Sequence, residues 1–80
     1  MTMSSNKLER FKKAVGKRLR SYRKILGLNV VNFAHKIKIS QGTLSELENG
    51  ISAPSAHTLA NICLYTDADI VWLLTGKEKK

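Results

Sequence analysis

The stretch FAHKIKISQGTLSELENG, at positions 33–50, decides the fold of this chain. In its first half, Phe33 and Ile37 lie four residues apart and therefore share one face of a short helix. In its second half, Leu44 and Leu47 set the apolar face of another short helix. Two short helices joined by a tight turn form a helix-turn-helix, and the stretch predicts that motif.

The ends of the second helix are marked by residues with known capping behaviour. Ser40 is a good N-cap, because its hydroxyl can accept a hydrogen bond from the free N–H of Gly42 or Thr43. Asn49 and Gly50 tolerate positive φ and therefore predict the end of the helix. The small and polar residues left on the outward side, which a core does not need, are Gln41, Gly42, Thr43, Ser45 and Glu46.

A long helix is predicted before the motif. Its apolar residues are spaced three or four apart, which places them in one stripe, and Gly27 can end the helix in the left-handed conformation. The first five residues are expected to fray, with Ser5 or Asn6 as the N-cap. The stripe consists of Leu8, Phe11, Val15, Leu19, Tyr22 and Leu26.

Further caps divide the rest of the chain into three more helices. Asn29 caps the first motif helix, so the motif spans about residues 30–50. Ser55 and Asp69 cap two later helices, and Gly76 ends the last one. The side chains expected to face inward from these two helices are Leu59, Ile62, Cys63, Ile70, Trp72, Leu73 and Leu74.

The expected architecture is therefore all-α, a compact domain of five helices over residues 1–76. Residues 77–80 form a charged tail or the start of a linker. Eighty residues allow one domain with a small core. A single Cys excludes an internal disulfide and suits a reducing cytosol, so a cytoplasmic protein is expected. The chain shows no signal peptide and no apolar run long enough to span a membrane.

The charge is distributed unevenly. Residues 1–38 hold eleven Lys and Arg against one Glu, whereas residues 39–76 hold four acids and no Lys or Arg. A basic half beside a weakly acidic one indicates a polyanion partner that approaches from one side, although a charged face can also be merely solvated.

Catalytic and metal-site interpretations find little support. Cys63 is expected on an apolar helix face, where a buried inert thiol is usual. Neither His35 nor His57 has a second ligand at metal spacing. No carboxylate pair and no phosphate-binding glycine loop is present in the sequence. We therefore expect no enzyme, no catalytic or metal-ligating residues and no cofactor.

The order of these signals resembles the phage repressor and Cro family of helix-turn-helix regulators, often called Xre-type. The resemblance covers about residues 15–76 and implies a sequence-specific transcriptional repressor, of phage or prophage type, that binds palindromic operator DNA as a dimer. The residues that carry it are Arg18-Leu19, Arg23, Gly27-Leu28, Phe33-Ala34, Ile39-Ser40, Thr43-Leu44, Leu47-Glu48-Asn49-Gly50, Pro54-Ser55, Thr58-Leu59 and Trp72-Leu73-Leu74-Thr75-Gly76.

The resemblance implies that the second motif helix enters the major groove of double-stranded DNA with its N-terminal residues nearest the bases. A glutamine can pair with adenine, and a glutamate can accept from cytosine N4. The expected base-reading residues are Gln41, Gly42, Ser45 and Glu46. The expected phosphate-binding residues are Arg23, Asn29, Lys36, Lys38, Ser40, Thr43 and Asn49.

The chain departs from the family pattern at two positions. Lys38 occupies a turn position that is usually Gly, and a left-handed conformation there costs about 1 kcal/mol. Val30 replaces a usual Gln, so one side-chain phosphate contact is lost. Arg23 and Glu48 match positions that pair in relatives, either as a purely structural ion pair or as one that also holds the guanidinium near DNA.

A second functional hypothesis remains open. The domain could mainly bind a protein, such as an antirepressor or a toxin, with DNA binding secondary. Four apolar residues where relatives often carry polar ones could be subunit or regulator contacts: Val30, Val31, Ile51 and Val71. Membrane binding by the basic first helix is disfavoured, because the core already explains its apolar stripe.

Overall fold

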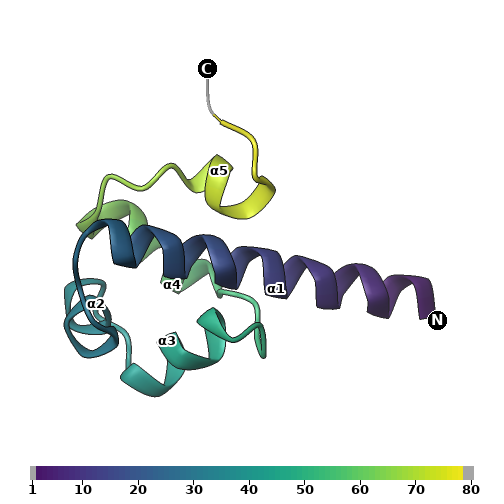
Figure 1. The fold of residues 1–80 in the computed structure, drawn as a ribbon, viewed down its shortest axis with the longest axis horizontal. Helices are drawn as coiled ribbons and strands as arrows, with labels where there is room; N and C mark the ends of the chain where they lie inside the picture. The colour runs from purple at the N-terminus through teal and green to yellow at the C-terminus, as the bar shows by residue number, and fades with distance from the viewer. Residues whose placement is uncertain (1, 79–80) are drawn as a thin grey trace.

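The computed structural model describes the backbone of residues 2–78 and the side chains of residues 6–78, and this part of the chain contains helices and no strand. α2 and α3 lie on one side of α1, and α5 lies on the other (Figure 1). The predicted all-α, five-helix fold is confirmed. The helices are α1 (Thr2–Ile25), α2 (Val30–Lys36), α3 (Gln41–Glu48), α4 (Ala56–Tyr65) and α5 (Ile70–Thr75).

The predicted start of the first helix is wrong. α1 already includes Thr2, so Ser5 and Asn6 lie inside the helix and neither is its N-cap. No Gly or Pro precedes Gly16, and lysine, arginine and leucine, which favour helices, fill much of this segment. The helix therefore continues beyond the region where other helices cover it. Met1, also expected to fray, lies outside the described residues.

The apolar stripe of α1 is buried only in the part of the helix that other helices cover. Val15 and Leu19 are 2% and 1% exposed. Leu8 and Phe11 are 51% and 38% exposed, because the first turns of α1 project past the other helices (Figure 1). The interior of the domain is therefore smaller than the stripe predicts.

All five helices contribute to one core. Burying one large apolar side chain contributes about 1.5–3 kcal/mol to the stability of the fold. This burial stabilises the short helices, which have little intrinsic stability. The buried apolar residues are Val15, Leu19, Phe33, Ala34, Ile37, Leu44, Leu47, Ile62 and Leu73.

α1 and α3 approach each other closely at Gly16. A Cβ atom at that position would collide with the carbonyl oxygen of Leu47 and would lie 2.9 Å from that of Glu48. Glycine inside a helix costs about 1 kcal/mol relative to alanine. The close approach explains why α1 carries one, and it brings the C-terminal end of α3 directly against α1.

The inward face of α4 differs from the prediction. Ile62 is fully buried as expected and Leu59 is partly buried, but Cys63 is exposed. Thr58 and Asn61 occupy the interior positions instead, at 5% and 8% exposure. Because Cys63 lies one residue, or about 100° of helical rotation, beyond Ile62, it turns outward. The expectation of a buried thiol is wrong.

The predicted N-caps are confirmed for the four later helices. In each, the cap residue is extended and its side chain accepts a hydrogen bond from the backbone N–H three residues later, which satisfies one free donor of the first turn. The donor and acceptor pairs are Asn32 N and Asn29 Oδ1 at 2.8 Å, Thr43 N and Ser40 Oγ at 3.0 Å, Thr58 N and Ser55 Oγ at 3.1 Å, and Trp72 N and Asp69 Oδ1 at 3.2 Å.

The turn between α2 and α3 has the predicted strain. Lys38 adopts a φ of 60°, in the left-handed region that favours glycine. Its Nζ lies 5.1 Å from the centroid of the Tyr65 ring, close enough for a cation–π contact with α4. The side chain thus recovers part of the conformational cost of its backbone.

Replacing Lys38 separates these two effects. Lys38→Gly and Lys38→Ala both lose the contact with Tyr65, but only glycine relieves the left-handed backbone. We expect the glycine variant to be more stable than the alanine variant by about 1 kcal/mol. Urea unfolding followed by circular dichroism measures the difference. Equal stability of the two variants would show that the turn is not strained.

Candidate nucleic-acid interface

One face of α3 buries apolar residues, and the opposite face presents polar ones. Leu44 and Leu47 are 0% and 2% exposed. Of the predicted base-reading residues, Gln41, Gly42 and Glu46 are exposed and Ser45 is partly buried. Ser45 is therefore the least accessible member of this set. A Cβ atom at Gly42 would meet nothing within 4 Å, so its surface is open to an approaching molecule.

The first turn of α3 orients its own hydroxyl groups. Ser40 Oγ accepts from the N–H of Thr43 at 3.0 Å and donates to Thr43 Oγ1 at 2.7 Å. The Ser40 hydroxyl is thereby used within the cap. Thr43 keeps its hydroxyl hydrogen and is exposed, so it is the better placed of the two to donate to an external acceptor.

A buried carboxylate joins α3 to α1. The side chain of Glu48 is 2% exposed. Arg23 Nε donates to Glu48 Oε2 at 2.7 Å, and Arg23 Nη2 donates to Glu48 Oε1 at 3.0 Å. This bidentate arrangement is the strong form of an ion pair. The hydrogen bonds to Glu48 also raise the pKa of Arg23 above its ordinary value.

Arg23 has little capacity left for a phosphate. Its Nη1 donates to the carbonyl oxygen of Leu28 at 3.0 Å, so three of its five N–H groups are committed. Its side chain is 11% exposed. The geometry favours the structural interpretation of this residue.

Arg20, which the sequence analysis did not single out, lies beside this ion pair. Its Nη2 donates to Asn49 Oδ1 at 3.0 Å, and its Nε lies 3.5 Å from Glu48 Oε1. With 44% of its side chain exposed, Arg20 is more accessible than Arg23. The bond occupies the amide oxygen of Asn49 and leaves the NH₂ group of this exposed residue as a donor. The signal in the sequence was that Arg20 lies three residues before Arg23, on a neighbouring part of α1.

The remaining predicted phosphate-binding residues lie in and around α2. Asn29 is exposed, but its side-chain oxygen caps α2. Lys36 ends α2 and is exposed, as is Lys38 in the turn. Val30, at the position where a side-chain contact was expected to be lost, is partly buried against the core. These residues thus surround α2, the first helix of the motif. Asn49 lies at the C-terminal end of α3, and Arg20 of α1 contacts it there.

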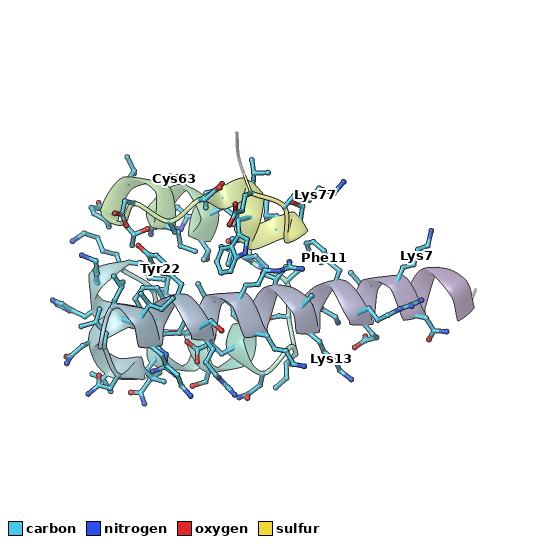
Figure 2. The ribbon with its side chains drawn as sticks, turned by 45° about the horizontal axis from the view of Figure 1, so that its top comes forward. Lys7, Phe11, Lys13, Tyr22, Cys63 and Lys77 are labelled. Atoms are coloured by element: carbon cyan, nitrogen blue, oxygen red, sulfur yellow. The ribbon has the colours of Figure 1, made fainter. Side chains whose placement is uncertain are left out.

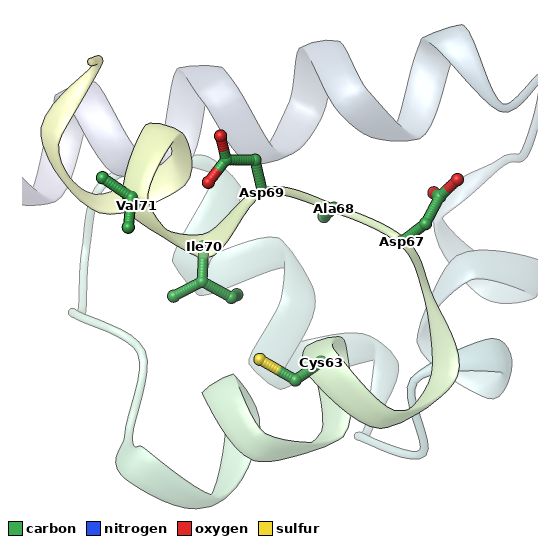
Figure 3. Close-up of a pocket in the computed structure, with 6 residues that line it drawn as sticks. All are labelled: Cys63, Asp67, Ala68, Asp69, Ile70 and Val71. Atoms are coloured by element: carbon green, nitrogen blue, oxygen red, sulfur yellow. The ribbon is translucent and has the colours of Figure 1, made fainter. Parts of the chain in front are cut away.

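The hollow between α4 and α5 offers no second chemical site. It is lined by Cys63, by residues 67–69 and by the first residues of α5 (Figure 3). Asp69 caps α5, and Asp67 accepts a 2.7 Å hydrogen bond from Tyr22 Oη, so both carboxylates have structural roles. Among residues 2–78, no three His, Cys, Asp or Glu residues gather as a metal site would require.

Comparison with known proteins agrees with this geometry. A family model described as a helix-turn-helix domain matches residues 16–79. The chain belongs to the helix-turn-helix domain family. No match was found among curated proteins or among solved structures. Membership in this family supports DNA as the partner and a DNA-binding regulator as the general class. None of the helices between residues 2 and 78 has the length and apolar character that a membrane span requires.

The roles of Arg23 and Arg20 in this helix-turn-helix domain can be distinguished by substitution. Arg23→Ala leaves Glu48 buried without its bidentate partner, and we expect a loss of about 3 kcal/mol in the free energy of unfolding. Arg20→Ala removes a more exposed partner and should cost less than about 1 kcal/mol. Urea titration measures both losses. Equal losses would contradict the assignment of Arg23 as the main partner of Glu48.

Proposed function

We propose that this protein is a sequence-specific transcriptional repressor, of phage or prophage type, that binds palindromic operator DNA as a dimer. The proposal rests on the resemblance to the phage repressor and Cro family and on membership in the helix-turn-helix domain family. The observation that carries it is the polar face of α3, which is exposed while the opposite face is fixed to α1 and the core.

In this proposal the outward face of α3 reads bases. Gln41 is long enough to form a bidentate pair with adenine N6 and N7, and Glu46 can accept from cytosine N4. Gly42 permits close approach of the backbone to a base edge, since nothing occupies the space where a Cβ atom would lie. Ser45 contributes a shorter contact, consistent with its partial burial.

Phosphate binding is proposed for residues at both ends of the motif. The proposed donors at α3 are the hydroxyl of Thr43 and the NH₂ group of Asn49, which the hydrogen bonds with Ser40 and Arg20 leave available. Lys36 and Lys38 supply exposed positive charge. Asn29 and Ser40 act mainly through the free backbone N–H groups of the helices they cap. Arg23 contributes through its two uncommitted N–H groups and its charge.

Dimer formation is proposed to depend on DNA. Residues exposed on α4 and α5 include Leu64 and Val71, at 72% and 45% exposure. Two such side chains alone do not supply the area of about 1,200 Å² or more in total that a stable interface buries. Two copies on adjacent half-sites would be held close together by the DNA, so weak contacts between them would be enough to favour joint binding.

The alternative is that the domain chiefly binds a regulatory protein such as an antirepressor or a toxin. The exposure of Val31 and Ile51, at 53% and 62%, favours keeping this alternative. A selection from random DNA followed by gel shift distinguishes the two proposals. Enrichment of a palindromic sequence supports the repressor, and failure to enrich any sequence supports the protein-binding alternative.

Base reading and charge neutralisation should respond differently to substitution. Gln41→Ala should cost about 1–3 kcal/mol on the selected sequence and little on random DNA, because only the selected sequence offers its base partner. Lys36→Ala should weaken binding to both and reduce the slope of log affinity against log salt by about one unit. Fluorescence anisotropy at several salt concentrations measures both effects. Identical losses for the two variants on every duplex would refute the assignment.

The assembly proposal predicts a change of state on DNA. Without DNA, the protein should be mostly monomeric at micromolar concentration, as a dimer that depends on DNA requires. On a palindrome with half-sites about one helical turn apart, two copies should bind. Analytical ultracentrifugation with and without the duplex tests this. A tight dimer in the absence of DNA would contradict it.

The domain boundaries follow from the same proposal. We propose that residues 1–76 form the DNA-binding unit and that residues 77–80 are a charged tail or the start of a linker. The last helix ends at Thr75, Gly76 adopts a φ of 80°, and the N–H of Lys77 donates to Thr75 Oγ1 at 3.1 Å. The last two tail residues lie outside the described part of the chain.

A further inference from the structure

α1 carries a row of basic side chains that neither the core nor the proposed contacts of the helix-turn-helix use. The row is spaced three, four, three and four residues apart, so it follows one face of the helix. All of its members are exposed. At 1.5 Å per residue it is roughly 21 Å long. We call it the α1 stripe, and it consists of Arg10, Lys13, Lys17, Arg20 and Lys24.

The α1 stripe adjoins the C-terminal end of α3. Arg20 donates to the side chain of Asn49 at the end of α3. The stem of Lys13 packs against Gly50, where an added Cβ atom would lie 2.8 Å from Lys13 Cγ. Lys13, Lys17 and Arg20 line one shallow hollow together with Glu48 and Asn49. A ligand that covers the polar face of α3 can therefore extend onto α1.

The charge of the stripe is largely uncompensated. The nearby carboxylates are already paired, Glu9 with Lys12 at 3.1 Å and Glu48 with Arg23 and Arg20. Within the described side chains, no other member of the stripe takes part in an ion pair. Like charges three or four residues apart destabilise a helix by some tenths of a kcal/mol per pair. An arrangement that costs stability in this way suits a polyanionic ligand.

We infer that the α1 stripe binds the phosphate backbone of the DNA that flanks the bases read by α3. This inference rests on the proposed function, since α3 must first place the duplex. Phosphates along one strand recur about every 3.4 Å of helix axis, so a row of this length lies within reach of several of them. Arg10 and Lys13 lie before residue 16, where the match to the helix-turn-helix family begins. They would therefore add a contact beyond the family's own segment.

A membrane surface fits the geometry less well. A basic helix that lies on a bilayer buries its apolar side chains and keeps its lysines near the headgroups. On α1 the exposed Leu8 and Phe11 belong to the side that faces the core, away from the stripe. Burying them in lipid would turn the stripe toward water. DNA on the α3 side would meet the stripe where Arg20 and Lys13 adjoin the end of α3.

The test compares two double variants that each remove two positive charges. Lys13→Ala/Lys17→Ala removes the middle of the stripe. Lys7→Ala/Lys77→Ala is the matched control, because Lys7 and Lys77 point to the other side of α1 from Lys13 (Figure 2). Alanine favours helix, so both variants should fold, which circular dichroism verifies. The probe is the duplex selected by the wild-type protein, made either without flanks or with flanks of about one helical turn.

We expect the wild-type protein and the control to bind the flanked duplex more tightly than the short one. The stripe variant should bind both with similar affinity, and its salt slope on the flanked duplex should fall by about two units, one for each lost phosphate contact. Equal salt slopes for the two variants, or no effect of flank length on the wild type, would overturn the inference and leave the proposed function intact.

Other outcomes separate the two proposals further. In one outcome, selection enriches no sequence, but the stripe variant still shows a smaller slope of log affinity against log salt on a long random duplex. That outcome supports phosphate binding by the stripe and contradicts the repressor function. If the wild-type protein binds no duplex, both proposals fall. If binding to anionic vesicles depends on the stripe while DNA binding does not, the stripe is a membrane contact and the inference is wrong.

Discussion

The orientation of α3 depends on one buried carboxylate. Glu48 receives two hydrogen bonds from Arg23, and the same guanidinium binds the Leu28 carbonyl at the start of the motif. A buried ion pair adds little net stability, because desolvation offsets most of its attraction. Its main effect here is to fix the orientation of α3. Apolar contacts through Leu44 and Leu47 alone would let α3 rotate about its axis, whereas a bidentate pair fixes which face points outward.

The same end of α3 also requires a close backbone approach. Gly16 lets α1 pass against the carbonyl groups of Leu47 and Glu48, and any larger residue would push the two helices apart. Separation would lengthen the hydrogen bonds from Arg23 and expose the carboxylate. A glycine that weakens α1 by itself is therefore part of what positions α3. At this position the close packing of α1 against α3 requires glycine, although glycine has a low helix propensity.

Local rules predicted much of this arrangement. The caps at Asn29 and Ser40 depend on nearest neighbours in the chain and are as expected. The left-handed turn at Lys38 was expected from the family resemblance and is also present. The failures concern tertiary packing. Cys63 could not be placed because α4 buries Thr58 and Asn61 in preference to it, a choice that the helical pattern alone does not reveal. The family resemblance indicated Arg23 as the partner of Glu48. The spacing of Arg20, three residues before Arg23, was only a weak signal that Arg20 joins this pair, because other solvated cations on α1 have similar spacing.

In the proposed function, base reading and attraction to DNA belong to different elements, because charge is distributed unevenly between them. α3 carries no Lys or Arg, and Glu46 is exposed on it. A carboxylate near phosphates opposes binding to every sequence except one that offers it a hydrogen-bond donor. α3 alone would therefore contribute sequence preference but little affinity for DNA. The attraction must come from neighbouring elements, and the basic residues of α1 lie directly beside the end of α3. Because phosphate contacts are blind to sequence, placing them on a different helix allows affinity to change without altering which bases are preferred. In this proposal, the ion pairs of Glu48 with Arg23 and Arg20 hold the base-reading helix in a fixed position relative to the phosphate-binding helix.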